Sequence, residues 1–598
     1  MKNIFLFFSL IFISFSCQNL SLLNRNPAAS NLNSENIKRQ YIIAVHGIGG
    51  DETTFGSMKT VLVDHLKTLR PETEFIFLSF KYPTGNSELS TFDFAYKSLS
   101  QFLRQQIPKP ESTDRITFVA HSQGGLVASI WYAGAALGVD QDGEFDTPEA
   151  AEIKKDQVYA NITHQIITLG TPFWGSKLAT FLNDEERFQV QKLPGLNLLF
   201  SLGDSELKEM SFLSNTIYSF RHTAIALTNN PRYQNLKQPE FIQIAGVYPR
   251  DEKKLFYDSK QVQDDSYFRL SEKLIKIITK SFMRLGFSSE KINSSEPDRP
   301  ESDVAVIVPS SRSEFYYATQ KVTCQTDHVD SSIFKKASVF KNPSYFLTES
   351  IHSPLVSQRS VGIANIPEFC KNPNECKHPS YRILLNSIAH CDRYACRKEA
   401  QADIINAQFE LNRTEDNYNM FLTNGSDLQG FSVEVDLRVP SDYDFPVAYF
   451  YNGSPNDLHP LDQKWILKQK EIFRKIISPR WDLISKDQSD LFEIKSARPN
   501  EVYSSLVQIK DMTFKKINSK HVRIHMTGLL KLKTLEMNVD QAVLYNKILN
   551  EGAVFPFEVN LPRYIDNQPK KQIIKALIKP GYTTFIDLDF KDAINCAQ

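Results

Sequence analysis

The sequence lacks an excess of charge of either sign. Its 598 residues contain 69 Lys and Arg against 69 Asp and Glu, so no overall field favours nucleic acid or an acidic partner. It also lacks any apolar run long enough to span a bilayer. The Gly-rich corner at residues 46–50 has neither the Lys-Ser/Thr of a phosphate-binding loop nor the spacing of a dinucleotide fingerprint. We therefore expect no nucleic-acid partner and no nucleotide cofactor.

The composition is that of folded protein. Hydrophobic residues make up 41% of the chain, including 42 Phe and 23 Tyr, which is typical of globular material. A chain of this length usually forms about three to four domains, although one α/β domain can occupy half of it.

The first residues resemble a bacterial lipoprotein signal. Lys2 precedes an apolar run at residues 4–15 that is too short to span a bilayer, and a small residue stands directly before Cys17. The resemblance implies that residues 1–17 are a signal segment and that cleavage leaves Cys17 as the lipid-modified first residue. The alternative is an ordinary secretory signal. Residues 18–39 are rich in Asn and Ser and are expected to be a flexible tether. We expect an exported protein anchored to the cell envelope.

The cysteines fit an exported chain. Apart from Cys17, six remain, an even number that permits pairing where disulfides are stable. Close spacing suggests Cys370 with Cys376 and Cys391 with Cys396. A zinc site that recruits His378 and His390 ranks lower, because the spacings differ from the usual C-x2-C pairs. We expect no metal. The six cysteines are Cys324, Cys370, Cys376, Cys391, Cys396 and Cys596.

Strand and helix patterns alternate through the first half of the chain. Alternation of this kind predicts a parallel sheet with right-handed crossovers, and ligands in such sheets bind beyond the carboxyl ends of the strands. Three turns fall at such ends: His46-Gly47, Ser122 and Thr171-Pro172. The predicted strands are residues 41–45, 75–80, 115–119, 165–169 and 241–247.

Ser122 stands at a sharp predicted corner between a strand and a helix. Small residues are needed two positions before and two after such a serine, and the sequence has Ala120 and Gly124 there. The corner would expose the Ser122 hydroxyl at the end of the strand. A serine hydroxyl is a weak nucleophile, so a histidine must accept its proton and a carboxylate must orient that histidine.

The order of these motifs resembles that of the α/β-hydrolase lipases. The motifs are His46-Gly47-Ile48-Gly49-Gly50, then Ala120-His121-Ser122-Gln123-Gly124-Gly125, then Leu169-Gly170-Thr171-Pro172. The resemblance implies an α/β-hydrolase domain over residues 40–365, with Ser122 as nucleophile. It also implies that the backbone N–H groups of Ile48 and Gln123 form the oxyanion hole.

The other two members of the triad follow from the family's chain order of Ser, acid and His. Ser302-Asp303-Val304, with Val308-Pro309 downstream, resembles the family's acid loop, so Asp303 is the predicted acid and Asp251 the alternative. His352 stands at the end of the last predicted strand and is the predicted base, with His328 as the alternative. His46 and His121 are interpreted as neighbours of the nucleophile.

Two further segments complete the domain prediction. The long connection at about residues 179–238 is apolar and resembles a lid over the site, or else is an extra pair of structural helices. Residues 366–598 begin with the cysteine cluster and continue as short alternating runs bounded by turn residues, which indicates a β-rich, sandwich-like domain. We interpret it as an accessory binding module, or as a spacer.

The sequence as a whole predicts an exported serine hydrolase that cleaves carboxylic esters, of lipids or other acyl groups, through an acyl-enzyme and without a cofactor. A second hypothesis is a surface lipoprotein whose hydrolase-like scaffold only binds a partner.

Overall fold

The structure is a computed structural model of the chain. It describes the following residues: 37–84, 89–140, 145, 147–176, 179, 204–211, 214–247, 303, 305–306, 308–322, 334–341, 343–352, 362–366, 370, 378–389, 430–439, 477–479, 507–518, 520–530, 548, 552–561, 570–579 and 582–589.

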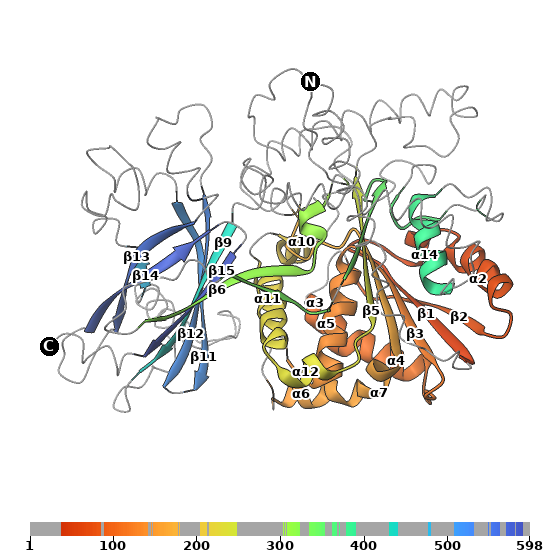
Figure 1. Cartoon of the computed structure of the whole chain (residues 1–598), viewed down its shortest axis with the longest axis horizontal. Helices are drawn as coiled ribbons and strands as arrows, with labels where there is room; N and C mark the ends of the chain where they lie inside the picture. The colour runs from red at the N-terminus through yellow and green to blue at the C-terminus, as the bar shows by residue number, and fades with distance from the viewer. Residues whose placement is uncertain are drawn as a thin grey trace, which may run out of the picture.

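A parallel sheet forms the centre of the first domain. Its strands are β1 (Arg39–Val45), β2 (Glu74–Phe80), β3 (Arg115–His121), β4 (Thr163–Leu169), β5 (Glu240–Val247) and β8 (Ser344–Glu349). They lie in the order β2-β1-β3-β4-β5-β8, and each neighbouring pair is parallel (Figure 1). The predicted α/β fold with a parallel central sheet is confirmed.

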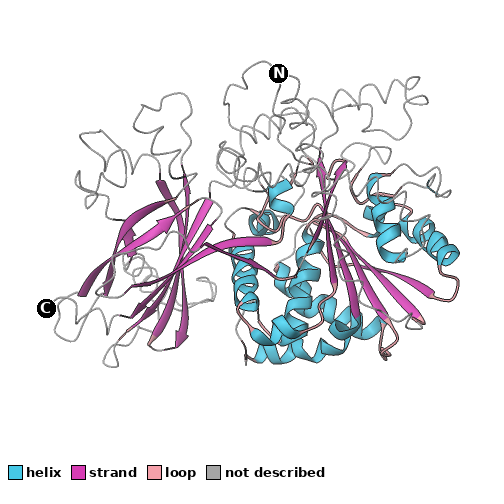
Figure 2. Ribbon diagram, in the orientation of Figure 1, coloured by secondary structure: helices cyan, strands magenta, loops and turns pink. Residues whose placement is uncertain are grey.

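Helices cover both faces of this sheet (Figure 2). On β1, the side chains of Tyr41, Ile43 and Val45 enter an apolar core on one face, called the first core. Those of Ile42 and Ala44 enter a core on the opposite face, called the second core. Successive side chains of a strand point to opposite faces, so one continuous apolar run serves both cores.

The helices divide between the two cores. The second core contains residues of η1 (Glu52–Phe55), α2 (Met58–Leu69) and α14 (Pro379–Ala389). The first contains residues of α3 (Thr91–Asp93), the π-helical segment η2 (Phe94–Leu99), α4 (Ser100–Gln106), α5 (Gln123–Leu137), α6 (Pro148–Ile153), α7 (Gln157–Ile162), α10 (Asp204–Met210), α11 (Asn215–Thr228) and α12 (Pro231–Asn235). The short 3-10 helix η3 (Lys154–Asp156) joins α6 to α7.

The carboxy-terminal region is built from two sheets, as the alternating sequence pattern predicted. The larger sheet has the order β11-β12-β9-β15-β6-β7 and the smaller one the order β10-β13-β14. Their strands are β6 (Glu314–Val322), β7 (Phe334–Ser338), β9 (Gly430–Arg438), β10 (Ile477–Pro479), β11 (Val507–Asn518), β12 (His521–Leu530), β13 (Ala553–Leu561), β14 (Lys570–Ile578) and β15 (Tyr582–Asp589).

The chain does not divide at residue 365 as the sequence suggested. β6 and β7 precede that position, yet β6 pairs in parallel with β15 and so extends the carboxy-terminal sheet. α14 follows it, yet the buried side chains of Tyr381, Leu384 and Ile388 pack in the second core of the hydrolase-like domain. The two regions exchange elements, because β6 finds its partner in a strand that lies far away in sequence.

The structure describes part of the predicted lid segment, including α11. α11 lies between the central sheet and the carboxy-terminal sheet in Figure 1, with Ile217, Phe220 and Ala224 buried in the first core. On its other side, His222 lies 3.3 Å from Glu434 of β9. α11 therefore joins the two regions. Residues 180–203 lie outside the described residues, so a lid remains a prediction. Within the described ranges, no helix is long and apolar enough to cross a membrane.

Candidate active site

Ser122 occupies a strained corner between β3 and α5. Its φ is 54°, and among the residues that the structure describes it alone has a positive φ without being glycine. A sparsely populated backbone conformation of this kind costs a residue with a side chain about 1–3 kcal/mol, so neighbouring groups must hold it in place. The Ser122 N–H donates to the Leu169 carbonyl at 2.9 Å, and the Ser122 carbonyl accepts from the Gly125 N–H at 3.0 Å.

Glycines give the corner the room that it needs. A Cβ atom at Gly47 would lie 2.5 Å from the Ser122 Cβ, and one at Gly124 would lie 2.4 Å from the carbonyl oxygens of Val45 and His46. Both distances are far below ordinary contact, so neither position tolerates a side chain without movement of the backbone. Gly124 is one of the two small residues that the corner required.

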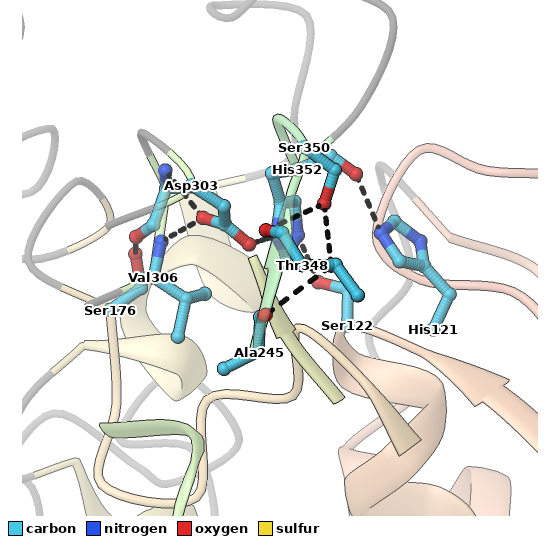
Figure 3. Close-up of polar contacts among 10 residues, drawn as sticks. His121, Ser122, Ser176, Ala245, Asp303, Val306, Thr348, Ser350 and His352 are labelled. Carbon is cyan, nitrogen blue, oxygen red and sulfur yellow. Dashed lines mark hydrogen bonds and ion pairs between the residues drawn. The ribbon is translucent and has the colours of Figure 1, made fainter. Parts of the chain in front are cut away.

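His352 lies against the serine, three residues after the end of β8 (Figure 3). Its Nε2 is 2.9 Å from the Ser122 Oγ, and its Nδ1 is 2.8 Å from the Asp303 Oδ2. A carboxylate can only accept, so Nδ1 carries the ring proton and Nε2 is free to accept the proton of the serine hydroxyl. The structure thus brings together the three residues that the sequence assigned to the triad.

Asp303 is fully buried and firmly held. Its Oδ1 accepts from the backbone N–H groups of Ala305 at 3.0 Å and Val306 at 2.7 Å, which leaves Oδ2 for the histidine. Its backbone carbonyl accepts from the N–H of His352 at 2.9 Å. The hydroxyl of Ser176 donates to the Ala305 carbonyl at 2.7 Å, and so ties the acid loop to the turn after β4.

Gly170 lies against the hydrogen bond between Asp303 and His352. A Cβ atom at this position would lie 2.8 Å from the Asp303 Oδ2 and 3.0 Å from the His352 Nδ1. Its φ of 58° is also in the left-handed region. The glycine in the predicted Gly170-Thr171-Pro172 turn is therefore required by both its conformation and its neighbours.

The two residues predicted to form the oxyanion hole flank the nucleophile. Gln123 is the first residue of α5, where a helix leaves its backbone N–H groups without an internal acceptor. Ile48 follows Gly47, the residue that packs on the Ser122 side chain. Both N–H groups belong to segments in contact with the serine, and their role as an oxyanion hole stays a prediction.

The turn that carries Ile48 is fixed by Tyr82, a residue to which the sequence gave no role. The Tyr82 hydroxyl donates to the His46 carbonyl at 2.6 Å, and the two rings stack with their centroids 4.4 Å apart. Burial lowers the pKa of His46 and raises that of Tyr82, so both rings are neutral at pH 7. On the other side of Ile48, the Gly49 N–H donates to the Thr84 hydroxyl at 3.0 Å.

His121 supports the base from the opposite side. Its Nε2 is 2.9 Å from the His352 carbonyl oxygen, and the two ring centroids lie 4.7 Å apart. Burial, and then the positive charge that His352 can carry, lower the pKa of His121 well below its ordinary value. His121 is thus a neutral donor to His352; the sequence indicated a neighbour of the nucleophile, and His121 directly precedes Ser122.

The remaining candidates lie mostly outside the described residues. These are Cys17, the alternative acid Asp251, the alternative base His328, His390 and all the cysteines except Cys370. Cys370 and His378 are buried, and the His378 Nε2 is 3.0 Å from the Gly362 carbonyl oxygen. Within the described ranges, no group of three or more His, Cys, Asp and Glu could hold a metal ion. The disulfide pairings stay a prediction.

Residues 35–185, which include the corner at Ser122 and the Ile48 turn, match a family model described as "Putative serine esterase (DUF676)". The parallel sheet, the strained serine and this match agree. The chain is a serine ester hydrolase of the α/β-hydrolase superfamily. No curated protein matches the sequence of this hydrolase.

Several solved structures are similar to this serine hydrolase. Phospholipase PlaB from Legionella pneumophila aligns over 92% of this chain and 93% of its own, with 12% identity and a TM-score of 0.44. Its complex with thio-NAD aligns over the same shares, with 13% identity and a TM-score of 0.43. The Bacillus licheniformis lipase BlEst2 in its propeptide form aligns over 45% of this chain and 42% of its own, with 16% identity and a TM-score of 0.25. These TM-scores are below 0.5, so no conclusion about function follows from them.

Proposed function

We propose that this hydrolase cleaves carboxylic esters by a two-step mechanism in which Ser122 is the nucleophile, His352 the general base and Asp303 the residue that orients the base. The observation that carries the proposal is the continuous contact from Ser122 Oγ through the His352 ring to Asp303 Oδ2, at 2.9 and 2.8 Å. Distances of this size allow proton transfer between a nucleophile and its base.

In the first step, the Ser122 oxygen attacks the ester carbonyl while its proton passes to the His352 Nε2. The carbonyl oxygen becomes negatively charged, and the N–H groups of Ile48 and Gln123 stabilise it. The imidazolium then gives its proton to the departing alcohol, which leaves an acyl group on Ser122. Water, deprotonated by His352, hydrolyses that ester and restores the serine.

The buried Asp303 acts without changing its own protonation. Its Oδ2 accepts from the His352 Nδ1, so the ring keeps the tautomer that leaves Nε2 free. The two backbone N–H groups on Oδ1 hold the carboxylate in one orientation. The positive charge that forms on His352 during attack is then compensated by a carboxylate that is already in place.

We propose first that the substrate is a lipid or other acyl ester. We propose second that the protein is exported and that Cys17 anchors it to the cell envelope. The chemistry of the site suits an acyl carbonyl, and the lipoprotein-like signal would place the enzyme at a lipid surface. Hydrolysis of p-nitrophenyl esters of increasing acyl chain length tests the first part. A Cys17→Ala variant that still incorporates labelled fatty acid and stays in the membrane fraction would refute the second part.

Ser122→Ala tests the chemistry. We expect the variant to fold as the wild type does but to lose hydrolysis of p-nitrophenyl butyrate and covalent labelling by a fluorophosphonate, since both need an activated serine. Ser129→Ala, at a buried serine about two turns further along α5, is the matched control and should retain both. Undiminished turnover in Ser122→Ala would refute the assignment. A wild-type chain that is neither labelled nor active would favour a scaffold that only binds.

A further inference from the structure

A chain of hydrogen bonds leads away from Gln123 to a carboxylate that the mechanism does not use. The side-chain Nε2 of Gln123 donates to the Thr91 Oγ1 at 3.0 Å. The Thr91 Oγ1 in turn donates to the Glu209 Oε2 at 2.7 Å, and the backbone N–H of Thr91 donates to the same oxygen at 2.9 Å. Glu209 thus holds Thr91 by two bonds, and Thr91 holds Gln123 by one.

The direction of these bonds is fixed by the groups themselves. An ionised carboxylate has no proton to donate, so the single hydroxyl proton of Thr91 goes to Glu209. The Thr91 oxygen must then accept, and the Gln123 amide nitrogen is the donor that it meets. Gln123 and Thr91 are both fully buried, so water does not compete for these positions. Loss of the acceptor on Glu209 would free the Thr91 hydroxyl to turn away from Gln123.

The helical segment that begins at Thr91 also contacts Tyr82, which supports the turn that carries Ile48. Phe94, three residues further on, packs against Tyr82 with the ring centroids 4.7 Å apart. Tyr82 donates to the His46 carbonyl and so fixes the turn that carries Ile48. The first turn of this segment therefore lies against the supports of both oxyanion donors.

The position of Glu209 is unfavourable for an ionised carboxyl group. It belongs to α10, in the segment predicted to be a lid, and the carboxyl group lies in a largely desolvated place. Burial raises its pKa, the two bonds from Thr91 lower it, and the nearby Glu206 and Asp93 raise it further. Lost hydration and nearby like charges disfavour an ionised carboxyl here, and the two bonds from Thr91 offset part of that cost.

We propose that Glu209 is a positioning residue for the oxyanion hole. Through Thr91 it sets the place of Gln123, whose backbone N–H stabilises the charge on the substrate oxygen, and it makes that place depend on α10. The inference rests on the proposed function. Glu209 touches no reacting atom, so its effect should appear in the rate of the chemical step and not in substrate affinity.

Two variants break the chain of hydrogen bonds from Glu209 through Thr91 to Gln123, called the relay, at different points. Thr91→Val deletes the hydroxyl at nearly constant volume, and Glu209→Ala deletes the acceptor. Complete loss of one oxyanion donor lowers kcat by about 10²–10³-fold. A displaced donor should cost less, and we expect a decrease in kcat of about tenfold for p-nitrophenyl butyrate, with KM nearly unchanged. The double variant should lose no more than either single one, because both changes break the same relay.

Conservative variants and a control separate positioning from a general loss of structure. Thr91→Ser keeps a hydroxyl and Glu209→Gln keeps an acceptor oxygen, so both should recover most of the lost kcat. Thr163→Val removes another buried threonine hydroxyl, which donates to the Tyr159 carbonyl at 2.8 Å at the start of β4. It should lower stability without changing kcat.

The outcomes distinguish a positioning role of Glu209 from a general loss of stability, and both from failure of the proposed function. Wild-type kcat in Thr91→Val and Glu209→Ala would overturn the role of Glu209 and leave the proposed function intact, as would an effect confined to KM. An equal loss of kcat in Thr163→Val would also overturn it, because the effect would then be one of stability. If the wild-type chain is inactive while Ser122 remains unlabelled by fluorophosphonate, the proposed function fails first and the inference fails with it.

Discussion

A single methyl group at Gly170 should disturb the hydrogen bond between Asp303 and His352, although neither residue is itself mutated. The Cβ atom of Gly170→Ala would lie 2.8 Å from the Asp303 Oδ2 and 3.0 Å from the His352 Nδ1. To reach 3.4 Å, the lower limit of ordinary contact, the carboxylate oxygen must move by about 0.6 Å. That oxygen is hydrogen-bonded to the base at 2.8 Å, so the movement lengthens or bends the bond.

The size of the effect can be bracketed. Complete loss of the acid's contribution lowers kcat of serine hydrolases by about 10⁴-fold, and a misplacement of about 1 Å can cost about 10²-fold. We therefore expect kcat of Gly170→Ala for p-nitrophenyl butyrate to fall by about 10²-fold. The rate of labelling by a fluorophosphonate should fall in parallel, since it reports on the same activated serine.

Gly138→Ala is the matched control. Gly138 has a φ of 70°, and the closest atom to its added Cβ is the Lys154 Cδ at 3.1 Å, in a flexible side chain. Both variants should lose about 1–2 kcal/mol of unfolding free energy from backbone strain, and Gly170→Ala should lose more, because its Cβ atom also meets Asp303 and His352. Only Gly170→Ala should lose activity. A kcat for Gly170→Ala within twofold of that for Gly138→Ala would refute the reasoning.

Two further perturbations follow from single contacts. Tyr82→Phe removes the donor to the His46 carbonyl. If this hydrogen bond contributes about 1 kcal/mol to the position of the Ile48 turn, kcat should fall about fivefold. Unfolding in urea is the control for stability, and an unchanged kcat would show that the turn keeps its position without the bond. Burial lowers the pKa of His378 from 6.5 to about 4, so the unfolded chain binds this proton first as the pH falls and the folded state loses up to about 3 kcal/mol between pH 6.5 and pH 4. His378→Gln should lose less stability over this interval in urea titrations, and equal losses in both proteins would contradict the burial argument.

The residues of the site were predictable because each belongs to a local pattern. The corner at Ser122 needs small neighbours, the base follows the last strand, and the acid follows the family's order along the chain. Asp303 lies at the predicted place although Val304 stands where the family usually has glycine. The requirement at this point is a carboxylate fixed by the N–H groups of Ala305 and Val306, and other residues can build such a loop.

The supports of the site were not predictable, because they join segments that are distant in sequence. Thr91 and Glu209 are 118 positions apart, and neither stands in a recognisable motif. The same reason explains the exchange of elements around residue 365. Alternation predicted β15 as a strand, but nothing in its residues indicates that its partner is β6.

The pairing of β15 with β6 also bears on the order in which the protein can be built. Ribosomes deliver Asp303 and His352 long before residues 582–589, yet the chain between the acid and the base runs through β6 and β7. Until β15 arrives, β6 has only β7 beside it within the described sheet, and one edge of β6 is left without hydrogen bonds. The segment that links Asp303 to His352 thus gains its second neighbouring strand only after β15 has been made. A pairing between strands so far apart in sequence forms slowly and leaves the edge of β6 exposed until it does.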